Sequence, residues 1–148
     1  MIKKLALALT LTLAAVAPLA TPASAADEPV REIIGHGLDA CPEHSLCLYQ
    51  DRDYNGTEDA RIWIITGSVE RLSAYDANDR ASSLYLNSRK SATLYGDAEY
   101  KGDNFQTFRR DRLADLNRVS GRSPGVPHAV HLWMNDSISS VWVGRDGL

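Results

Sequence analysis

Cysteine is almost absent from this sequence of 148 residues, which contains Cys41 and Cys47 and no cysteine after them. A small scaffold held together by several disulfides is therefore excluded. The four histidines form no H-E-x-x-H motif and no other compact zinc spacing, and no second Cys or His pair accompanies the two cysteines. The sequence thus excludes zinc fingers and zinc peptidases of the familiar kinds.

Basic residues are too few for a nucleic-acid-binding protein. The sequence has 16 Lys and Arg against 19 Asp and Glu. Two of the basic residues and none of the acidic ones lie in the first 25 positions, so the rest of the chain carries 14 against 19, a formal net charge of −5. Such a chain lacks the positive surface that binds phosphates, and nucleic acid is not expected as a partner.

Long hydrophobic runs are missing except at the N-terminus, where Lys3 and Lys4 precede an apolar run over residues 5–20 that leads to Ala-Ser-Ala25. This order is typical of a secretory signal peptide, with residues 1–25 removed by cleavage after Ala25. The run is too short for a membrane span, and no cysteine lies just after the cleavage point for lipid attachment. We therefore expect a secreted protein without a membrane anchor, whose remaining residues suit one domain.

Two short patterns each occur twice, in the same order. The first has two tyrosines five positions apart and then a glycine, and it occupies residues 49–56 and again 95–102. The second is Asn-Asp-x-x-Ser-Ser, at residues 78–83 and again 135–140. The glycines permit positive φ and the tyrosines can pack across the bend, so the first pattern predicts a folded turn. The sequence as a whole predicts a tandem duplication of one supersecondary unit.

Both halves consist of short β-type runs separated by turns. The expected strands are 46–49, 60–66, 82–86, 92–95, 104–109 and 139–143. Between the last two of these, Leu113, Leu116 and Val119 fall at helical spacing. Two equivalent runs of strands predict an all-β sandwich of two Greek-key motifs. The expected organisation is an extended lead-in at 26–40 and one domain at 41–148, with the first Greek key at about 41–88 and the second at about 89–148.

The second half is longer than the first by eleven residues between its turn glycine and its polar pattern. The additional residues lie between Arg118 and His128, and residues 120–127 contain two prolines and two glycines. This composition favours an exposed, restricted loop over a strand, and the loop is either functional or a neutral insertion. Gly121 to Gly125 also spells G-x-S-x-G, but in a proline-containing loop instead of a strand-to-helix elbow, so we expect no catalytic serine and no enzyme.

The Asn-Asp-x-x-Ser-Ser stretches concentrate carboxylate, amide, hydroxyl and backbone carbonyl oxygens within a few residues. Calcium binds about six to eight such oxygens in a flexible geometry, and the spacing here is not that of an EF-hand. The alternative is that these side chains only cap and turn the chain through hydrogen bonds to the backbone. Because the stretch occurs twice, each time after a glycine turn, the sequence favours a calcium site.

Together the two patterns resemble the Greek-key signature of the βγ-crystallins, and Asn-Asp-x-x-Ser-Ser is similar to the double-clamp calcium motif of that family. The resemblance covers Leu46 to Val143. It implies a βγ-crystallin-like sandwich that binds two calcium ions, with each polar stretch contributing to both. The implied ligands are Asn78, Asp79, Ser82, Asn135, Asp136 and Ser139, with backbone carbonyls near Arg52 and Ala98.

Two cysteines six positions apart in an exported chain predict one disulfide that closes a small loop, with free thiols as the alternative. The segment from Cys41 to Tyr49 is similar to the opening of the secreted actinobacterial peptidase inhibitors of family I36, which are themselves crystallin-like sandwiches. The resemblance implies an inhibitor whose partner is an extracellular peptidase. The inhibitor that typifies the family braces its reactive loop with a second disulfide. This chain has none there, so no reactive-site residue is carried over.

We therefore expect a secreted, monomeric, calcium-binding protein that inhibits a peptidase. The alternative is a calcium-stabilised extracellular structural, stress or antimicrobial protein with no protease target. A rigid exposed segment binds a protease cleft with little ordering cost, so the candidate inhibitory residues are Arg122, Ser123, Pro124, Gly125, Val126 and Pro127. Trp63, Trp133 and Trp142 lie in or beside strand-like runs, where a core position is favoured over a carbohydrate platform.

Overall fold

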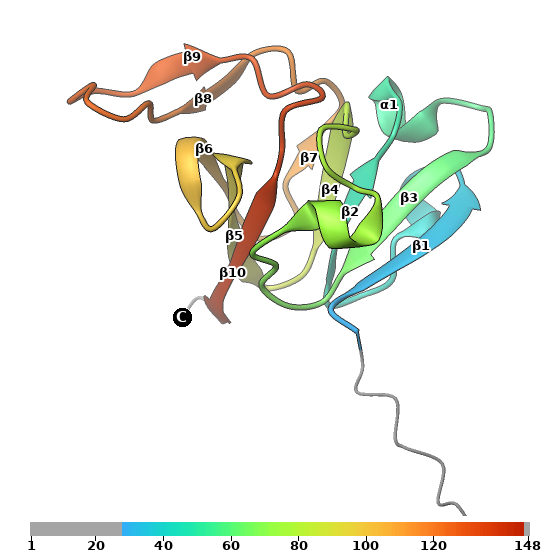
Figure 1. The fold of residues 1–148 in the computed structure, drawn as a ribbon. Helices are drawn as coiled ribbons and strands as arrows, with labels where there is room; N and C mark the ends of the chain where they lie inside the picture. Colours follow the sequence, from blue (N-terminus) through green and yellow to red (C-terminus); the bar gives the residue numbers. More distant parts are fainter. Residues whose placement is uncertain (1–27, 147–148) are drawn as a thin grey trace, which may run out of the picture.

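The computed structural model describes residues 28–146, so the expected signal peptide and its cleavage site lie outside the described residues. Strands make up most of the regular secondary structure of this part, and they form two antiparallel sheets and a separate hairpin (Figure 1). The first sheet has the order β1-β3-β2-β4-β7, and the second β10-β5-β6. No helix between residues 28 and 146 is long and apolar enough to cross a membrane. The expected all-β sandwich of two Greek keys is confirmed.

The first sheet consists of β1 (Val30–Gly35), β3 (Ala60–Ile65), β2 (Ser45–Tyr49), β4 (Ser83–Asn87) and β7 (Arg112–Leu113). The second consists of β10 (Ser140–Asp146), β5 (Lys90–Asp97) and β6 (Lys101–Thr107), and the hairpin of β8 (Val119–Gly121) and β9 (Val130–Leu132). Short helical turns are α1 (Arg52–Asn55) and the 3-10 turns Leu38–Ala40 and Leu72–Tyr75. Each expected strand is present, with ends shifted by no more than three residues.

Two segments differ from the sequence-based expectation. Part of the lead-in forms β1, where Ile33 is paired with Ile62 and Val30 is buried in the core, so the sheet begins upstream of Cys41. The helical spacing of Leu113, Leu116 and Val119 was misleading, because these residues lie in β7, in a connecting segment and in β8. Leu116 lies in irregular backbone and Val119 in a strand, yet both side chains are buried. Tertiary packing therefore overrides the local helical periodicity.

Each half contributes a short extended segment to the sheet of the other half. Strand β7 belongs to the second half but pairs with β4 of the first, through Leu113 and Leu84. In the equivalent place, Val69 of the first half forms an isolated bridge with Val141 of β10. The main core fills the space between the sheets, with Leu48, Trp63, Leu84, Leu94, Phe105 and Val141 among its members. Because each half completes the sheet of the other, the halves share one hydrophobic core.

The predicted disulfide between Cys41 and Cys47 is confirmed, with 5.9 Å between the two Cα atoms. Both cysteines are buried in a second, smaller apolar cluster on the outer face of the first sheet, together with Tyr49, Ile62, Ile64 and Tyr85. Tyr49 donates its hydroxyl to the carbonyl of Gly37 over 3.0 Å, and burial raises the pKa of that phenol well above its usual value. The bridge thereby ties the segment before β2 to this cluster.

Replacing both cysteines with alanine is expected to destabilise the protein only modestly. The cysteines are six positions apart, and the entropy model for so small a loop predicts a loss of about 2 kcal/mol in the free energy of unfolding. Chemical denaturation of the double variant measures this loss. A fully unfolded variant at room temperature would show instead that the bridge stabilises the whole domain.

Only one of the three tryptophans takes the expected core position. Trp63 is fully buried, whereas Trp133 is 72% exposed and Trp142 is 45% exposed, so the expectation was wrong for these two. In β10, Val141 faces the core and the alternation of a strand turns Trp142 outward. After β9, the core position belongs to Met134, which is 1% exposed, and its neighbour Trp133 is left in solvent.

Candidate functional site

The two tyrosine turns share the packing of their rings and a left-handed backbone at two equivalent positions. The ring centroids of Tyr49 and Tyr54 are 5.6 Å apart, and those of Tyr95 and Tyr100 are 5.8 Å apart. The backbone of Asp53 and Tyr54, and of Glu99 and Tyr100, is left-handed. Burial raises the pKa of Tyr54 and of Tyr100 above the usual value for a phenol. The repeated pattern therefore folds each hairpin back over itself, as the sequence predicts.

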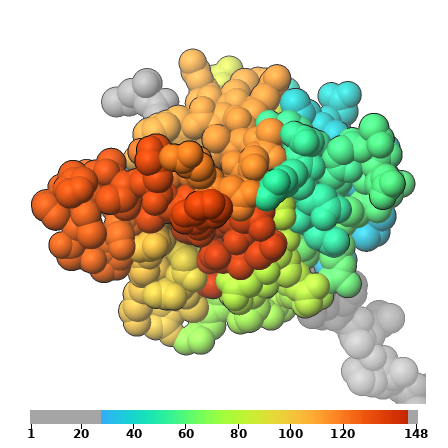
Figure 2. Space-filling model, turned by 90° about the horizontal axis from the view of Figure 1, so that it is seen from above, coloured from blue at the N-terminus to red at the C-terminus, as the bar shows by residue number. Residues whose placement is uncertain are grey.

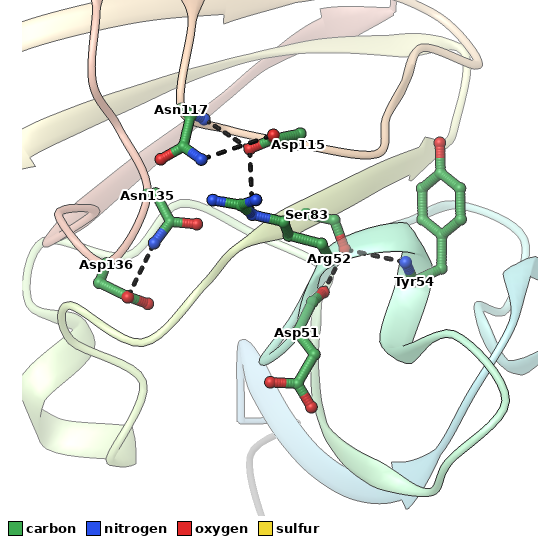
Figure 3. A network of polar contacts seen from close by, with 8 residues as sticks. All are labelled: Asp51, Arg52, Tyr54, Ser83, Asp115, Asn117, Asn135 and Asp136. Atoms are coloured by element: carbon green, nitrogen blue, oxygen red, sulfur yellow. Dashed lines mark hydrogen bonds and ion pairs between the residues drawn. The ribbon is translucent and has the colours of Figure 1, made fainter.

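The second serine of each polar motif is a positioning residue, in the role that the sequence offered as the alternative to calcium binding, because it turns the chain through hydrogen bonds to the backbone. Ser83 is buried, donates to the carbonyl of Asp51 over 2.6 Å and accepts from the Tyr54 N–H over 3.1 Å (Figure 3). Ser140 makes the equivalent bonds to Asp97 and Tyr100, at 2.6 and 3.0 Å. Each motif is thus hydrogen-bonded to the turn of its own half. The occurrence of this serine in both copies of the motif is the sequence feature that indicates its role.

The two polar motifs lie against each other and exchange equivalent backbone hydrogen bonds. The N–H of Asp79 donates to the carbonyl of Ile138 over 3.1 Å, and that of Asp136 donates to Ala81 over 2.9 Å. Both aspartates have left-handed backbone, with φ of 54° and 50°. This exchange carries the side chains of one half into the neighbourhood of the other, although residues 78–83 and 135–140 are far apart in the sequence.

Oxygen atoms from the two halves meet between the motifs. Ser139 donates its hydroxyl to a carboxylate oxygen of Asp79 over 3.2 Å. The side-chain amides of Asn78 and Asn135 each donate to the carboxylate of the following aspartate, over 2.5 and 2.8 Å. Ser82 and Ser139 are 8% and 7% exposed, respectively. Of the six side chains that the resemblance implies, Ser139 and Asp79 thus contact each other across the two halves, and the Asn-Asp pairs contact within each motif.

One of these oxygens is buried without a partner. The side-chain oxygen of Asn135 makes no hydrogen bond within the described part of the chain. A buried acceptor in that state costs about 1–3 kcal/mol unless a donor or a cation satisfies it. The same region offers carboxylate, amide and hydroxyl oxygens, which are the ligands that calcium prefers. The residues present therefore fit a calcium ion.

The donor set is poor in carboxylates. Among residues 28–146, no group of three or more His, Cys, Asp or Glu side chains is placed to hold a metal. Any cation site between the motifs therefore relies on amide, hydroxyl and backbone oxygens beside at most two carboxylates. Fewer charged ligands favour a weaker calcium site than a carboxylate-rich loop gives.

The hairpin peptides with the implied carbonyl ligands are held in equivalent ways. The N–H of Asp53 donates to the carbonyl of Ala114 over 2.9 Å, and that of Glu99 donates to Glu70 over 2.8 Å. These bonds fix the two peptide planes that contain the carbonyls of Arg52 and Ala98.

The two turns differ in the side chain at this position. The Arg52 guanidinium pairs with Asp115 over 3.5 Å and points from α1 toward the segment that carries Asn135 (Figure 3). Ala98 has no charge. The two turns thus have equivalent backbone hydrogen bonds, but only the first has a positively charged side chain at this position.

The expected loop over residues 120–127 forms the tip of a hairpin, and only its first two residues are in a strand. Ser120 and Gly121 belong to β8, and the N–H and carbonyl of Arg122 bond with those of Asn104 in β6 over 2.6 and 2.8 Å. A Cβ on Gly121 would collide with the carbonyl of Asn104, so this glycine permits the close approach of β8 to β6. The hairpin projects from the body of the molecule (Figures 1 and 2).

The tip of the hairpin is a tight turn. The N–H of Val126 donates to the carbonyl of Ser123 over 3.1 Å, and Gly125 has φ of 81°. Proline followed by a glycine of positive φ is the signature of a type II turn. Arg122, Pro124, Gly125 and Pro127 are exposed, whereas Ser123 and Val126 are half-buried. Ser123 thus opens a turn between strands, which is not the strand-to-helix setting of a nucleophile elbow.

Residues 36–107 match the model of a protein family, peptidase inhibitor family I36. The match includes the disulfide, the first polar motif and both tyrosine turns, and it ends before the β8–β9 hairpin. A search of curated proteins gave no match.

Solved structures of βγ-crystallin type resemble the fold. One, from work on the evolution of the eye lens βγ-crystallin domain fold, has a TM-score of 0.58 and 21% identity, covering 78% of this chain and 97% of that one. Spherulin 3a from Physarum polycephalum gives 0.50 and 20%, with the same coverages. The N-terminal domain of Protein S gives 0.50 and 19%, covering 70% and 99%. At these identities the likeness establishes a βγ-crystallin fold and nothing about ligands.

Proposed function

We propose that this chain, which has a βγ-crystallin fold and resembles peptidase inhibitor family I36, is a secreted calcium-binding protein that inhibits an extracellular peptidase. The match of residues 36–107 to the inhibitor family is the observation that supports inhibition. The contact between Ser139 and Asp79, which joins the two repeated motifs, carries the assignment of calcium. The protein would act as a monomer, outside the cell, without catalysis.

Each proposed calcium site combines the turn and serine of one half with the Asn-Asp pair of the other. The N–H of Ser139 donates to the carbonyl of Tyr95, which places it beside the second turn, and its hydroxyl reaches Asp79 of the first half. The N–H of Ser82 donates to Tyr49 in the same way, beside the first turn. One site therefore takes Ser139, the Asn78-Asp79 pair and the Ala98 carbonyl, and the other takes Ser82, the Asn135-Asp136 pair and the Arg52 carbonyl.

The unpartnered oxygen of Asn135 supports this assignment, because a cation would satisfy it. Calcium supplies a positive charge that attracts oxygens of both halves at once. The chain itself supplies the rigidity, since Ser83 and Ser140 hold the turns and the exchanged backbone bonds hold the motifs. The charge of Arg52 opposes a cation at the site that contains Asn135, so we expect this site to be the weaker one.

The projecting hairpin is the part of the molecule best suited to enter a protease cleft. Its tip is preorganised by the Pro124-Gly125 turn, so binding orders little additional backbone. Arg122, just before this turn, is bonded to Asn104 of β6, which fixes the position of the hairpin on the body. We therefore retain residues 122–127 as the proposed inhibitory residues, because the hairpin projects and most of these residues are exposed.

Inhibition is tested by incubating the protein that begins at Ala26 with secreted metallo-, serine and cysteine peptidases, in saturating calcium. We expect at least one of them to lose its activity at a molar ratio near one. The same titration with protein denatured by heat and reduction is the control for competition by an unfolded substrate. If every peptidase keeps its activity, the alternative of a calcium-stabilised structural, stress or antimicrobial protein replaces inhibition.

A further inference from the structure

A cleft lies beside the turn between β5 and β6 and contacts the projecting hairpin. Its volume is about 410 Å³, and its lining includes Asp97, Asp103, Pro124, Trp133, Met134 and Ser137. Pockets for small organic ligands occupy about 300–1,000 Å³. The cleft is therefore large enough for a small molecule or for one unit of a polymer.

An exposed aromatic ring forms part of the wall of this cleft. Trp133 is the most exposed of the large hydrophobic side chains in the described residues, at 72%. The fold does not need it in the core, because Met134 fills the core position beside it. An indole has a broad apolar face and an N–H donor, so it binds ligands that combine apolar and polar surface.

Two carboxylates and two glycines complete the cleft. Within residues 28–146, the side chains of Asp97 and Asp103 make no ion pair and no hydrogen bond, whereas Glu99 of the same turn is paired with Arg71 and Lys101. Gly96 and Gly102 also line the cleft and bring no side chain into it. The carboxylates are thus free to accept hydrogen bonds from a ligand that reaches the aromatic ring.

We infer that this cleft binds a neutral sugar unit of an extracellular polysaccharide. One face of a pyranose ring presents C–H groups that pack against an indole, while its hydroxyls donate to carboxylates. The cleft offers both kinds of surface at once. The inference does not depend on calcium or on peptidase inhibition.

A lysine or arginine side chain of a basic peptide is the competing occupant, since it too would meet an aromatic face and carboxylates. Three apolar side chains, those of Pro124, Trp133 and Met134, line the cleft beside the acceptors. This mixture suits the apolar face and hydroxyl rim of a sugar better than a single cationic group. The two occupants are separated by experiment.

The test is a titration followed by two-dimensional NMR of the full secreted chain in saturating calcium, with chitotetraose, cellotetraose and a tetralysine peptide as probes. We expect one of the tetraoses to shift the indole signal of Trp133 and the amides near Asp103 with saturation, and tetralysine to shift neither. Replacement W133A is expected to weaken the affinity for that sugar at least tenfold. The matched replacement W142A, at an exposed tryptophan on β10, is expected to change it less than twofold.

The carboxylate has its own control. Replacement D103N is expected to lower the affinity several-fold, and E58Q, at an exposed residue of the first half, is expected to leave it unchanged. The inference is overturned if neither tetraose gives saturable shifts, if W133A and W142A weaken binding equally, or if only tetralysine binds in the cleft. Amide dispersion of each variant in the same spectra shows whether it is folded, so loss of the fold is distinguished from loss of the site.

Discussion

Calcium is expected to raise the melting temperature of the metal-free protein by about 10 °C or more. An ion that binds only the native state adds about 2.7 kcal/mol per site when its concentration is 100 times the dissociation constant. A domain of this size gains roughly 2–8 °C for each kcal/mol, so two filled sites give a large shift. Scanning calorimetry with calcium and with a chelator measures it, and magnesium at equal concentration should have a much smaller effect.

The variants D79N and D136N show whether this shift comes from the proposed sites. Asparagine tolerates the left-handed backbone of these positions as aspartate does, so each replacement removes a charge without straining the turn. We expect each variant to lose part of the calcium-dependent shift, D79N more than D136N because it removes the stronger site, and the double variant to lose nearly all of it. The control is D53N, at another exposed aspartate with left-handed backbone, whose side chain is not a proposed ligand. A full shift in the double variant would contradict the assignment.

Removing the side chains at the hairpin tip is expected to weaken peptidase inhibition by 30-fold or more. Residues that dominate a protein interface contribute about 2 kcal/mol or more each when truncated. The triple replacement of Arg122, Ser123 and Val126 by alanine keeps Pro124 and Gly125, and so keeps the turn. The inhibition constant against the peptidase found by titration measures the effect, and calcium binding should be unchanged.

The matched control replaces Thr57 and Glu58 by alanine, because these exposed residues lie in the loop that follows the first tyrosine turn. That variant should inhibit like the original protein.

A second variant replaces residues 117–133 with residues 73–76, the connection of the first half, since Met134 bonds to Leu116 as Ala77 bonds to Leu72. Inhibition that survives in both the triple variant and this graft would place the reactive surface elsewhere, within the segment that matches the inhibitor family.

The repeated patterns predicted the fold because each of them fixes local geometry. The glycines at 56 and 102 take positive φ and the tyrosine pairs pack across the bend, which sequence spacing alone indicates. The positions of Trp133 and Trp142 were not predictable in the same way. Their exposure depends on Met134 and Val141 taking the adjacent core positions, and that choice is made by packing between the sheets.

The candidate site shows the same division. The motif residues were predicted as ligands from their oxygen-rich pattern. The backbone hydrogen bonds by which Asp79 and Asp136 each contact the opposite motif are a tertiary feature. The charge of Arg52 and the buried oxygen of Asn135 also gain their meaning only from neighbours distant in sequence. Likewise, the loop indicated by the prolines and glycines is present, but the pairing of β8 with β9 on either side of it was not predicted.

The most direct test of the account is an isothermal titration of the metal-free protein with calcium. We predict two ions per chain with unequal affinities, with one site lost in D79N and the other in D136N. Replacing Arg52 by alanine should raise the calcium affinity of the weaker site. The absence of binding heat at any calcium concentration up to several millimolar, together with an unchanged melting temperature, would contradict the proposal that the two repeated motifs form calcium sites.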